Sequence, residues 1–161
     1  MITLCHTTID TPIGPLLLVG DGDALHGVGF ASGPRPPRVD PAWREDRAPL
    51  APVIAQLEEY FAGERTAFDL PLAFTGTPFQ VAVWEALREI PYGQTISYGE
   101  LAQRVGRPTA VRAVGATNGR NPIAVVVPCH RVIGTDGSLT GFGGGLPTKR
   151  ALLELERPSL F

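Results

Sequence analysis

The sequence changes character at Thr75-Gly76-Thr77-Pro78, and this change limits the folds that the chain can adopt. Before it, short apolar segments alternate with turn residues, whereas after it apolar residues recur at helical spacing. Thr77 is suited to cap a helix that has Pro78 at its first position. We therefore expect an α/β (α+β) chain of two domains, residues 1–76 and 77–161.

The N-terminal domain is expected to be a small antiparallel sheet with one helix. The predicted strands are separated by Pro and Gly turns and cover residues 2–8, 16–19 and 25–30. Residues 31–52 hold six prolines without hydrophobic periodicity, which predicts an exposed loop. A helix is predicted over residues 52–61, and residues 69–74 are expected to return as a strand.

The C-terminal domain is expected to be mostly helical. A first helix begins at Pro78, and its buried face is formed by Phe79, Val83, Trp84 and Leu87. A helix-turn-helix pattern follows, in which Ser97 and Glu100 match a capping box. Gly106 fits the end of that helix, and Thr109 is expected to cap a second helix over residues 110–118. Ordinary helix packing in a compact domain would produce the same pattern.

The second helix of this pattern has unusually small side chains on its surface. Its small residues are Ala110, Ala113, Gly115, Ala116 and Gly119, and Arg112 is its only long side chain. Such a surface allows another molecule to approach the helix backbone closely.

Charge is distributed unevenly along the chain. Residues 1–77 hold five Arg and ten acidic residues, whereas residues 78–161 hold nine basic and six acidic residues. Five Arg stand against the single acid Glu100 within residues 99–131. Positive charge concentrated in this way can attract a polyanion, but charge alone favours the simpler interpretation of a solvated surface.

The chain has two cysteines, Cys5 and Cys129, and no Cys-x-x-Cys pair. Two thiols do not form a disulfide framework. No apolar stretch reaches the 18 residues of a membrane helix, and the N-terminus lacks a secretory signal. We therefore expect a soluble cytoplasmic protein with reduced thiols.

Cys129 follows an apolar run, residues 123–127, that is predicted to be a buried strand ended by Pro128. His130 and Arg131 are polar groups that are not expected in a core. A glycine-rich loop over residues 141–145 could form a pocket wall, and a helix is predicted over residues 148–156. Cys129 is therefore a candidate nucleophile, while a buried structural cysteine is the alternative.

A nucleophilic Cys129 would need a base, because a free thiol with a pKa of about 8.5 is mostly protonated at neutral pH. His130 can act as that base. Neighbours in an extended strand point to opposite faces, so the chain must bend at Cys129 or a water must bridge the two side chains. His130 also needs an acceptor to orient it, and Glu154 and Glu156 are the candidates.

The segment Pro128-Cys129-His130-Arg131-Val132 resembles the active-site signature of the O6-alkylguanine-DNA alkyltransferases, also called methylated-DNA–protein-cysteine methyltransferases. The similarity covers most of residues 78–161, through Ile96-Ser97-Tyr98-Gly99, Arg112-Ala113-Val114-Gly115, Asn121-Pro122, Gly144-Gly145, Lys149 and Leu152-Leu153. Residues 1–77 match weakly, at Thr11-Pro12-Ile13-Gly14. The resemblance implies a ribonuclease H-like N-terminal domain before the helical catalytic domain.

The resemblance also implies catalytic roles. Cys129 would accept the alkyl group, with His130 as its base through a bridging water and Glu156 holding His130. Asn121 would support the turn at the active site. Tyr98 would crowd the 3′ phosphate, help to rotate the nucleotide out and protonate the leaving guanine.

The implied partner is double-stranded DNA that contains O6-alkylguanine, with O4-alkylthymine as a further substrate. The helix over residues 110–118 would enter the minor groove, and its small residues Ala113 and Gly115 would permit the close approach. Arg112 would replace the flipped base in the stack. Phe142 would stack near that base, and the backbone of Gly143 and Gly144 would line its pocket.

The implied reaction is direct-reversal DNA repair in which each molecule reacts once. The product is a thioether, which water does not hydrolyse, and no metal or organic cofactor is needed. The protein would be a monomer that can assemble side by side on DNA. In some relatives Tyr and Ser stand at the positions of Phe142 and Gly143, so tolerance for bulky adducts should differ while methyl transfer persists.

Other functions remain as alternatives. A non-catalytic lesion-binding protein of the alkyltransferase-like type would lack the acceptor cysteine. A cysteine hydrolase would have its Cys and His far apart in sequence. A phosphate-binding loop at residues 141–145 would need a Lys-Ser/Thr ending. Cys5 and His26 could supply two ligands of a structural zinc, but four are wanted and no further Cys exists there, so no metal site is expected.

Overall fold

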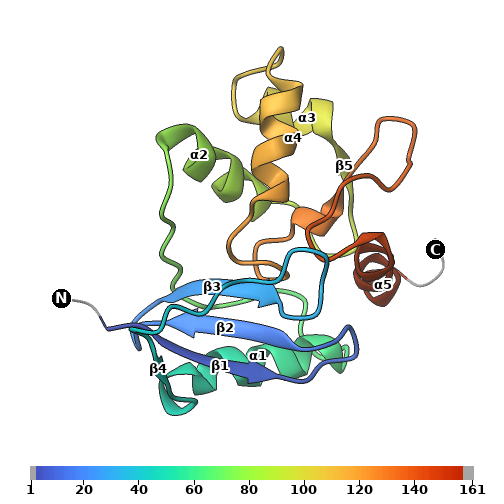
Figure 1. The fold of residues 1–161 in the computed structure, drawn as a ribbon. Coiled ribbons are helices and arrows are strands. Elements are labelled where there is room, and N and C mark those ends of the chain that lie inside the picture. The colour runs from blue at the N-terminus through green and yellow to red at the C-terminus, as the bar shows by residue number, and fades with distance from the viewer. Residues whose placement is uncertain (1–2, 158–161) are drawn as a thin grey trace.

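The computed structural model describes residues 3–157, in which a sheet separates one helix from a group of four (Figure 1). The sheet contains β1 (Cys5–Ile9), β2 (Leu16–Gly20), β3 (Leu25–Phe30) and β4 (Arg44–Glu45), and α1 (Ala51–Phe61) packs on one side of it. The other side carries α2 (Pro78–Leu87), α3 (Tyr98–Arg104), α4 (Val111–Gly119) and α5 (Leu146–Glu156). The expected fold class is confirmed.

The sheet has the order β3-β2-β1-β4. Its first three strands are antiparallel, with Cys5 opposite Gly20 and Ile9 opposite Leu16. All five residues of β2, which lies between β1 and β3, are buried. The sheet is mixed, however, because β4 runs parallel to β1.

The segment over residues 31–52 is more ordered than the prediction of an exposed loop. Arg44 and Glu45 pair with Cys5 and His6, and a 3-10 turn over Ala48–Leu50 leads directly into α1. Leu50 is buried in the core. The sequence pattern did not predict these features, because a strand of two residues is too short to show hydrophobic periodicity.

The strand expected over residues 69–74 is absent. Leu25 and Leu72 form an isolated bridge, in which the Leu25 amide donates to Pro71 O (2.8 Å) and the Ala73 amide donates to Leu25 O (2.9 Å). The segment therefore runs along the edge of β3 without extending the sheet.

The helix ends follow local chemistry. Thr77 forms a complete capping box with Gln80 at the start of α2, as its position before Pro78 suggests. Ser97 caps α3 by accepting from the Glu100 amide (3.0 Å), but the Glu100 side chain pairs with Arg104 instead, so this box is half formed. The prediction for Thr109 is wrong, because α4 begins after Ala110 with no side-chain cap.

One hydrophobic core runs through both halves of the chain. Buried residues of the sheet and α1 join those of α2, α3 and α4 in a single cluster. β3 also bonds directly to the C-terminal half, since the Val28 amide donates to Pro122 O and the Ala124 amide donates to Val28 O, both at 3.0 Å. No helix within residues 3–157 is long and apolar enough to cross a membrane.

Candidate active site

Residues 123–128 form a buried compact turn, so the prediction of a strand is wrong. The Val127 amide donates back to Ile123 O (2.9 Å), and the Val126 amide donates to Ala124 O (2.8 Å). Val125, at the centre of the tighter turn, has a φ of 70°. A β-branched residue in this region is strained by about 1–3 kcal/mol, and only a well-defined surrounding structure maintains it.

Asn121 holds this turn with its side chain. Its Nδ2 donates to Val127 O (2.7 Å), and its Oδ1 accepts from the Ile123 amide (3.0 Å). These bonds satisfy backbone groups that a sheet would otherwise pair. They explain why an apolar run of this kind does not form a strand.

The turn delivers Cys129 to the start of a 3-10 helix, Cys129–Arg131, which supplies the bend expected at this point. Cys129 is 6% exposed. Burial raises the pKa of its thiol, while the Asn121 side chain and the positive charge of Lys149 act in the opposite direction. Proton removal from Cys129 therefore needs a base nearby.

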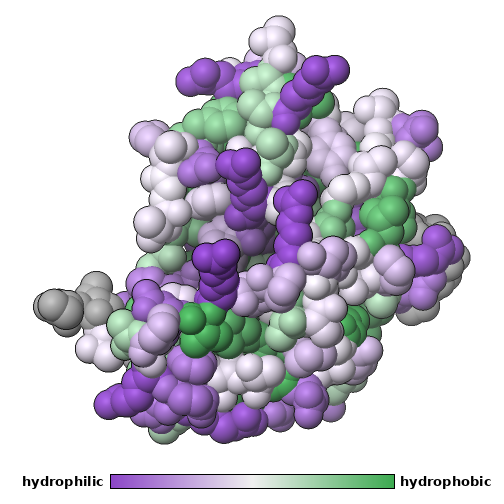
Figure 2. Space-filling view, in the orientation of Figure 1, coloured by the Kyte–Doolittle hydropathy of each residue, from purple (hydrophilic) through white to green (hydrophobic). Residues whose placement is uncertain are grey.

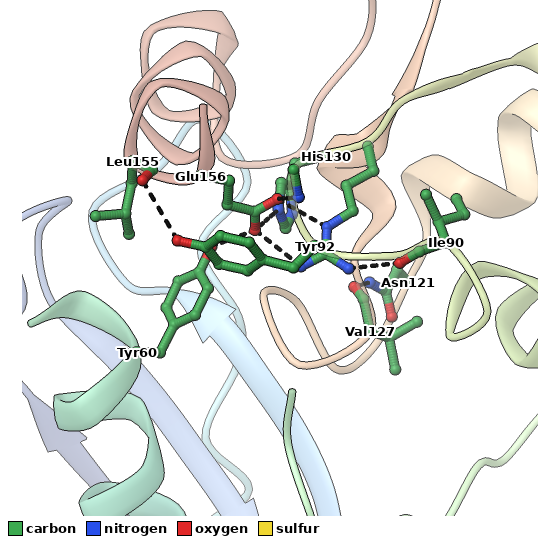
Figure 3. A network of polar contacts seen from close by, with 10 residues as sticks. Tyr60, Ile90, Tyr92, Asn121, Val127, His130, Leu155 and Glu156 are labelled. Atoms are coloured by element: carbon green, nitrogen blue, oxygen red, sulfur yellow. Dashed lines mark hydrogen bonds and ion pairs between the residues drawn. The ribbon is translucent and has the colours of Figure 1, made fainter. Parts of the chain in front are cut away.

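His130 and Arg131 are buried, contrary to the expectation that they lie outside the core, and both contact Glu156 of α5 (Figure 3). His130 Nε2 lies 2.8 Å from Glu156 Oε2. Arg131 donates to both carboxylate oxygens, from Nε at 2.8 Å and from Nη2 at 2.9 Å. This pairing makes it possible to bury the positive charge of Arg131 and the negative charge of Glu156 together. Of the two candidates to orient His130, Glu154 instead pairs with Arg150.

The network determines which nitrogen of His130 can accept a proton. Burial raises the pKa of Glu156, but the hydrogen bonds from His130 and Arg131 outweigh it and hold this pKa well below its usual value. An ionised carboxylate only accepts, so His130 Nε2 carries the proton and Nδ1 has a free lone pair. Within residues 3–157 this buried Nδ1 has no hydrogen-bond partner. Burial also lowers the pKa of His130, against the influence of Glu156.

Two further polar side chains surround Cys129. Asn118, which the sequence analysis did not single out, donates to Cys129 O (3.4 Å). Lys149 donates to Val132 O (2.6 Å) and Thr140 O (2.9 Å), and burial lowers its pKa to about 8. Asn118 carries no sequence signal apart from its place on α4.

Cys129 lines a cavity of about 210 Å³ to which both halves of the chain contribute. The C-terminal half supplies Asn121, Phe142 and Gly143 to this cavity, and the N-terminal half supplies Val28, Gly29, Phe30, Arg35 and Pro37. The rings of Phe30 and Phe142 lie 5.3 Å apart. A Cβ at Gly144 would lie 2.8 Å from the Phe30 ring, so only glycine permits this contact.

A wider cavity of about 770 Å³ adjoins the first and shares Arg35, Arg120 and Phe142 with it. Tyr98 and Gly115 lie on its wall, and Tyr98 donates to Thr140 O (3.1 Å). Figure 2 shows a hollow on this face, flanked by hydrophilic side chains. The space leads from the surface of α4 toward Cys129.

The outer surface of α4 presents Arg112 and Ala113, which are both exposed. A Cβ at Gly119 would meet no atom within 4 Å, and one at Gly115 would make ordinary contact with the Tyr98 ring at 3.6 Å. Internal packing therefore does not require the small residue at Gly119. The surface is open to an external partner.

Cys5 and His26 contact other groups. Cys5 Sγ lies 4.0 Å from Arg44 Nη2, and His26 pairs with Asp21 at 2.8 Å. In the described part of the chain, no three His, Cys, Asp or Glu side chains are grouped to hold a metal ion.

Comparison with known proteins assigns both halves of the chain. Residues 4–74 match the family model described as "6-O-methylguanine DNA methyltransferase, ribonuclease-like domain", and residues 78–158 match the model of the DNA binding domain of the same enzymes. Methylated-DNA–protein-cysteine methyltransferase of Methanosarcina acetivorans is 51% identical over 94% of this chain and 97% of its own length. The same enzyme of Mycobacterium bovis is 53% identical over 94% of this chain and 92% of its own length.

A solved structure is similar over the same extent. Mycobacterium tuberculosis OGT in complex with DNA superposes with a TM-score of 0.90 at 51% identity, over 96% of this chain and 93% of that one. Sequence and fold agree, and the chain belongs to the family of methylated-DNA–protein-cysteine methyltransferases.

Proposed function

We propose that this protein repairs DNA by moving the alkyl group of O6-alkylguanine to Sγ of Cys129, once per molecule. The observation that carries this proposal is the position of Cys129 in a cavity, next in sequence to a histidine whose Nδ1 is free to accept a proton. His130 is oriented for this role by Glu156 at 2.8 Å.

The reaction begins with loss of the Cys129 proton toward His130 Nδ1 through a bridging water. The thiolate then attacks the alkyl carbon, so a sulfur–carbon bond forms and the bond between that carbon and O6 breaks. The electron pair of the broken bond leaves with guanine, which takes up a proton from Tyr98. Asn121 supports the turn on which the nucleophile sits.

The product is a thioether, which has no carbonyl for water to attack. Neither a metal nor an organic cofactor takes part in this scheme. Each molecule is therefore consumed, and the amount of repair equals the amount of protein.

The alkylated base must leave the helix before it can reach Cys129, because guanine O6 faces its pairing partner in duplex DNA. In our proposal α4 enters the minor groove, where the small Ala113 and Gly115 permit close approach. Arg112 takes the place of the extruded base, and Tyr98 crowds the 3′ phosphate. Phe142 stacks near the extruded base, and the backbone of Gly143 and Gly144 lines its pocket.

Several finer features belong to the same proposal. The protein acts in the cytoplasm, where its thiols stay reduced. It is a monomer in solution and can assemble side by side on DNA. O4-alkylthymine is a second substrate, because its alkyl group is also attached to an exocyclic oxygen at the pairing edge.

Reaction stoichiometry tests the main step. Excess duplex DNA with a single O6-methylguanine is incubated with the protein, and repaired bases are counted against protein molecules. We expect repair to stop at one equivalent. Continued turnover would contradict the proposal, and binding without repair would instead identify a lesion-binding module.

The role of Arg112 is tested by comparing two substrates. Arg112→Ala should slow repair of duplex DNA far more than reaction with free O6-methylguanine, because only the duplex requires base extrusion. Arg65→Ala, which removes a charge from the N-terminal half, is the matched control. Equal losses on both substrates would exclude this role for Arg112.

A further inference from the structure

Tyr60 connects the N-terminal half of the chain to the buried network at the active site. It lies in the last turn of α1, is fully buried and is among the largest side chains in the core. Its hydroxyl donates to Oε2 of Glu156 at 2.6 Å, as Figure 3 shows. This bond joins residues that are 96 positions apart in the sequence.

The bond reaches the same carboxylate oxygen that contacts His130. Oε2 accepts from Tyr60 at 2.6 Å, from His130 Nε2 at 2.8 Å and from Arg131 Nη2 at 2.9 Å. Oε1 accepts from Arg131 Nε at 2.8 Å and from the Gly93 amide at 3.4 Å. Among the described residues, Tyr60 is the one donor to this carboxylate from the N-terminal half.

The surroundings of Tyr60 keep it a donor. Its ring packs against Phe61 at 5.2 Å, Phe68 at 5.3 Å and Tyr92 at 6.3 Å. Burial and the charge of Glu156 raise the pKa of the Tyr60 hydroxyl far above its usual value. Short hydrogen bonds from a neutral donor to an ionised acceptor are among the stronger ones in proteins.

We propose that Tyr60 is a positioning residue for alkyl transfer, which holds the Glu156 carboxylate in place against His130 from the C-terminal end of α1. This inference rests on the proposed role of His130 as the base for Cys129. It assigns to the N-terminal half a part in the reaction chemistry, beyond its share in the cavity wall.

The physical consequence concerns the charge on Glu156. The hydrogen bond from the Tyr60 hydroxyl partly compensates the negative charge on Glu156 Oε2, so the carboxylate attracts a proton on His130 less strongly. Without this bond the carboxylate would stabilise protonated His130 more strongly, and the pKa of His130 would rise. His130 would then be blocked as a base at a pH where it is free in the native protein.

The ionisable groups around Glu156 come from four segments. Tyr60 approaches from α1, and Tyr92 from the turn after α2. His130 and Arg131 approach from the 3-10 helix. Lys149 lies on α5 itself, and its positive charge lowers the pKa of both His130 and Cys129. A change confined to Tyr60 leaves all the others in place.

Tyr60→Phe tests the proposal because it removes the hydroxyl and keeps the ring. Single-turnover rates on O6-methylguanine duplex are measured across pH, and we expect the acidic limb to move upward by about 0.5–1 pH unit in the variant. Tyr92→Phe is the matched control, because the Tyr92 hydroxyl donates to Leu155 O (3.4 Å) and not to the carboxylate. Its profile should coincide with that of the native protein.

NMR titration of the His130 imidazole measures the same shift without alkyl transfer, so it remains informative if the variant is slow or if the proposed reaction itself fails. A raised pKa of His130 in Tyr60→Phe alone supports the proposal. An unchanged pKa, or equal shifts in both variants, overturns it, even where Tyr60→Phe lowers the unfolding temperature. Loss of stability alone would indicate a structural bond only.

Discussion

The two cysteines of this chain are almost equally buried, at 4% exposed for Cys5 and 6% for Cys129, yet their surroundings differ. Cys5 lies in β1, where its backbone is paired with Gly20 on one side and Arg44 on the other. Cys129 follows a strained turn, lines a cavity and lies beside a network of ionisable side chains. We therefore expect the reactivity of the two thiols to differ with their surroundings, because burial alone only raises the free energy of the thiolate.

The comparison also shows how differently the two regions are held. The sheet around Cys5 is held by a regular backbone ladder. The region around Cys129 depends on side chains, with Asn121 bonding the turn and Glu156 bonding His130 and Arg131. Single substitutions should therefore disturb the Cys129 region much more than the Cys5 region.

The largest effect is expected from Glu156→Ala. It removes the carboxylate that accepts from Nε and Nη2 of the buried Arg131 and from the Tyr60 hydroxyl, while Arg131 Nη1 keeps its hydrogen bond to Ile90 O. The loss of one partner from a buried ion pair costs about 3–5 kcal/mol. Urea unfolding measures the change. Glu154→Ala, which breaks only an exposed pair with Arg150, is the matched control and should change stability by at most about 0.5–1 kcal/mol. Similar losses for both variants would contradict the importance of the buried network.

A smaller effect is expected on DNA binding, which can be tested separately from the reaction at Cys129. Ala113→Leu places a bulky side chain on the exposed surface of α4 and should weaken binding to lesion-containing duplex by at least about tenfold, which corresponds to 1.4 kcal/mol. Ala55→Leu makes the same change on α1, on the other side of the sheet, and should leave binding unchanged. Band-shift titration gives both affinities, and equal values for the two variants would exclude α4 as the DNA-binding surface.

The smallest effect is in the pH dependence of stability. Burial lowers the pKa of His130 in the folded protein, so the unfolded chain takes up a proton below about pH 6.5 that the folded protein excludes. Stability should therefore fall as pH decreases through this range, by up to about 1.4 kcal/mol per pH unit. His130→Gln should remove this contribution to the slope in urea unfolding. The same slope in both proteins would show that His130 does not contribute.

Local patterns in the sequence predicted much of the fold. Thr77 before Pro78 predicted the start of α2. Gly106, which was expected at the end of the next helix, follows the C-cap residue of α3 and has a φ of 74°. These features could be predicted because caps and glycine turns depend on a few adjacent residues.

Long-range contacts could not be predicted in this way. The apolar run over residues 123–127 has the composition of a strand, and only the bonds of Asn121 reveal the turn. His130 and Arg131 were placed outside the core because their partner Glu156 is 26 and 25 residues away. The helical pattern over residues 52–61 is consistent with a buried Tyr60, but nothing near it in the sequence indicates its hydrogen bond to Glu156, 96 residues away. The residues alone left Glu154 and Glu156 as possible partners of His130, and the family resemblance selected Glu156, which the structure places 2.8 Å from His130 Nε2.

Peptide mapping after repair tests the central claim most directly, because it asks which of two similarly buried thiols is the acceptor. The protein is incubated with an equal amount of duplex DNA that contains O6-methylguanine, then digested and analysed by mass spectrometry. We predict one methyl group per molecule, located on the peptide that contains Cys129, with the peptide of Cys5 unmodified. Methylation of Cys5, or repair of the DNA without methylation of Cys129, would contradict the account.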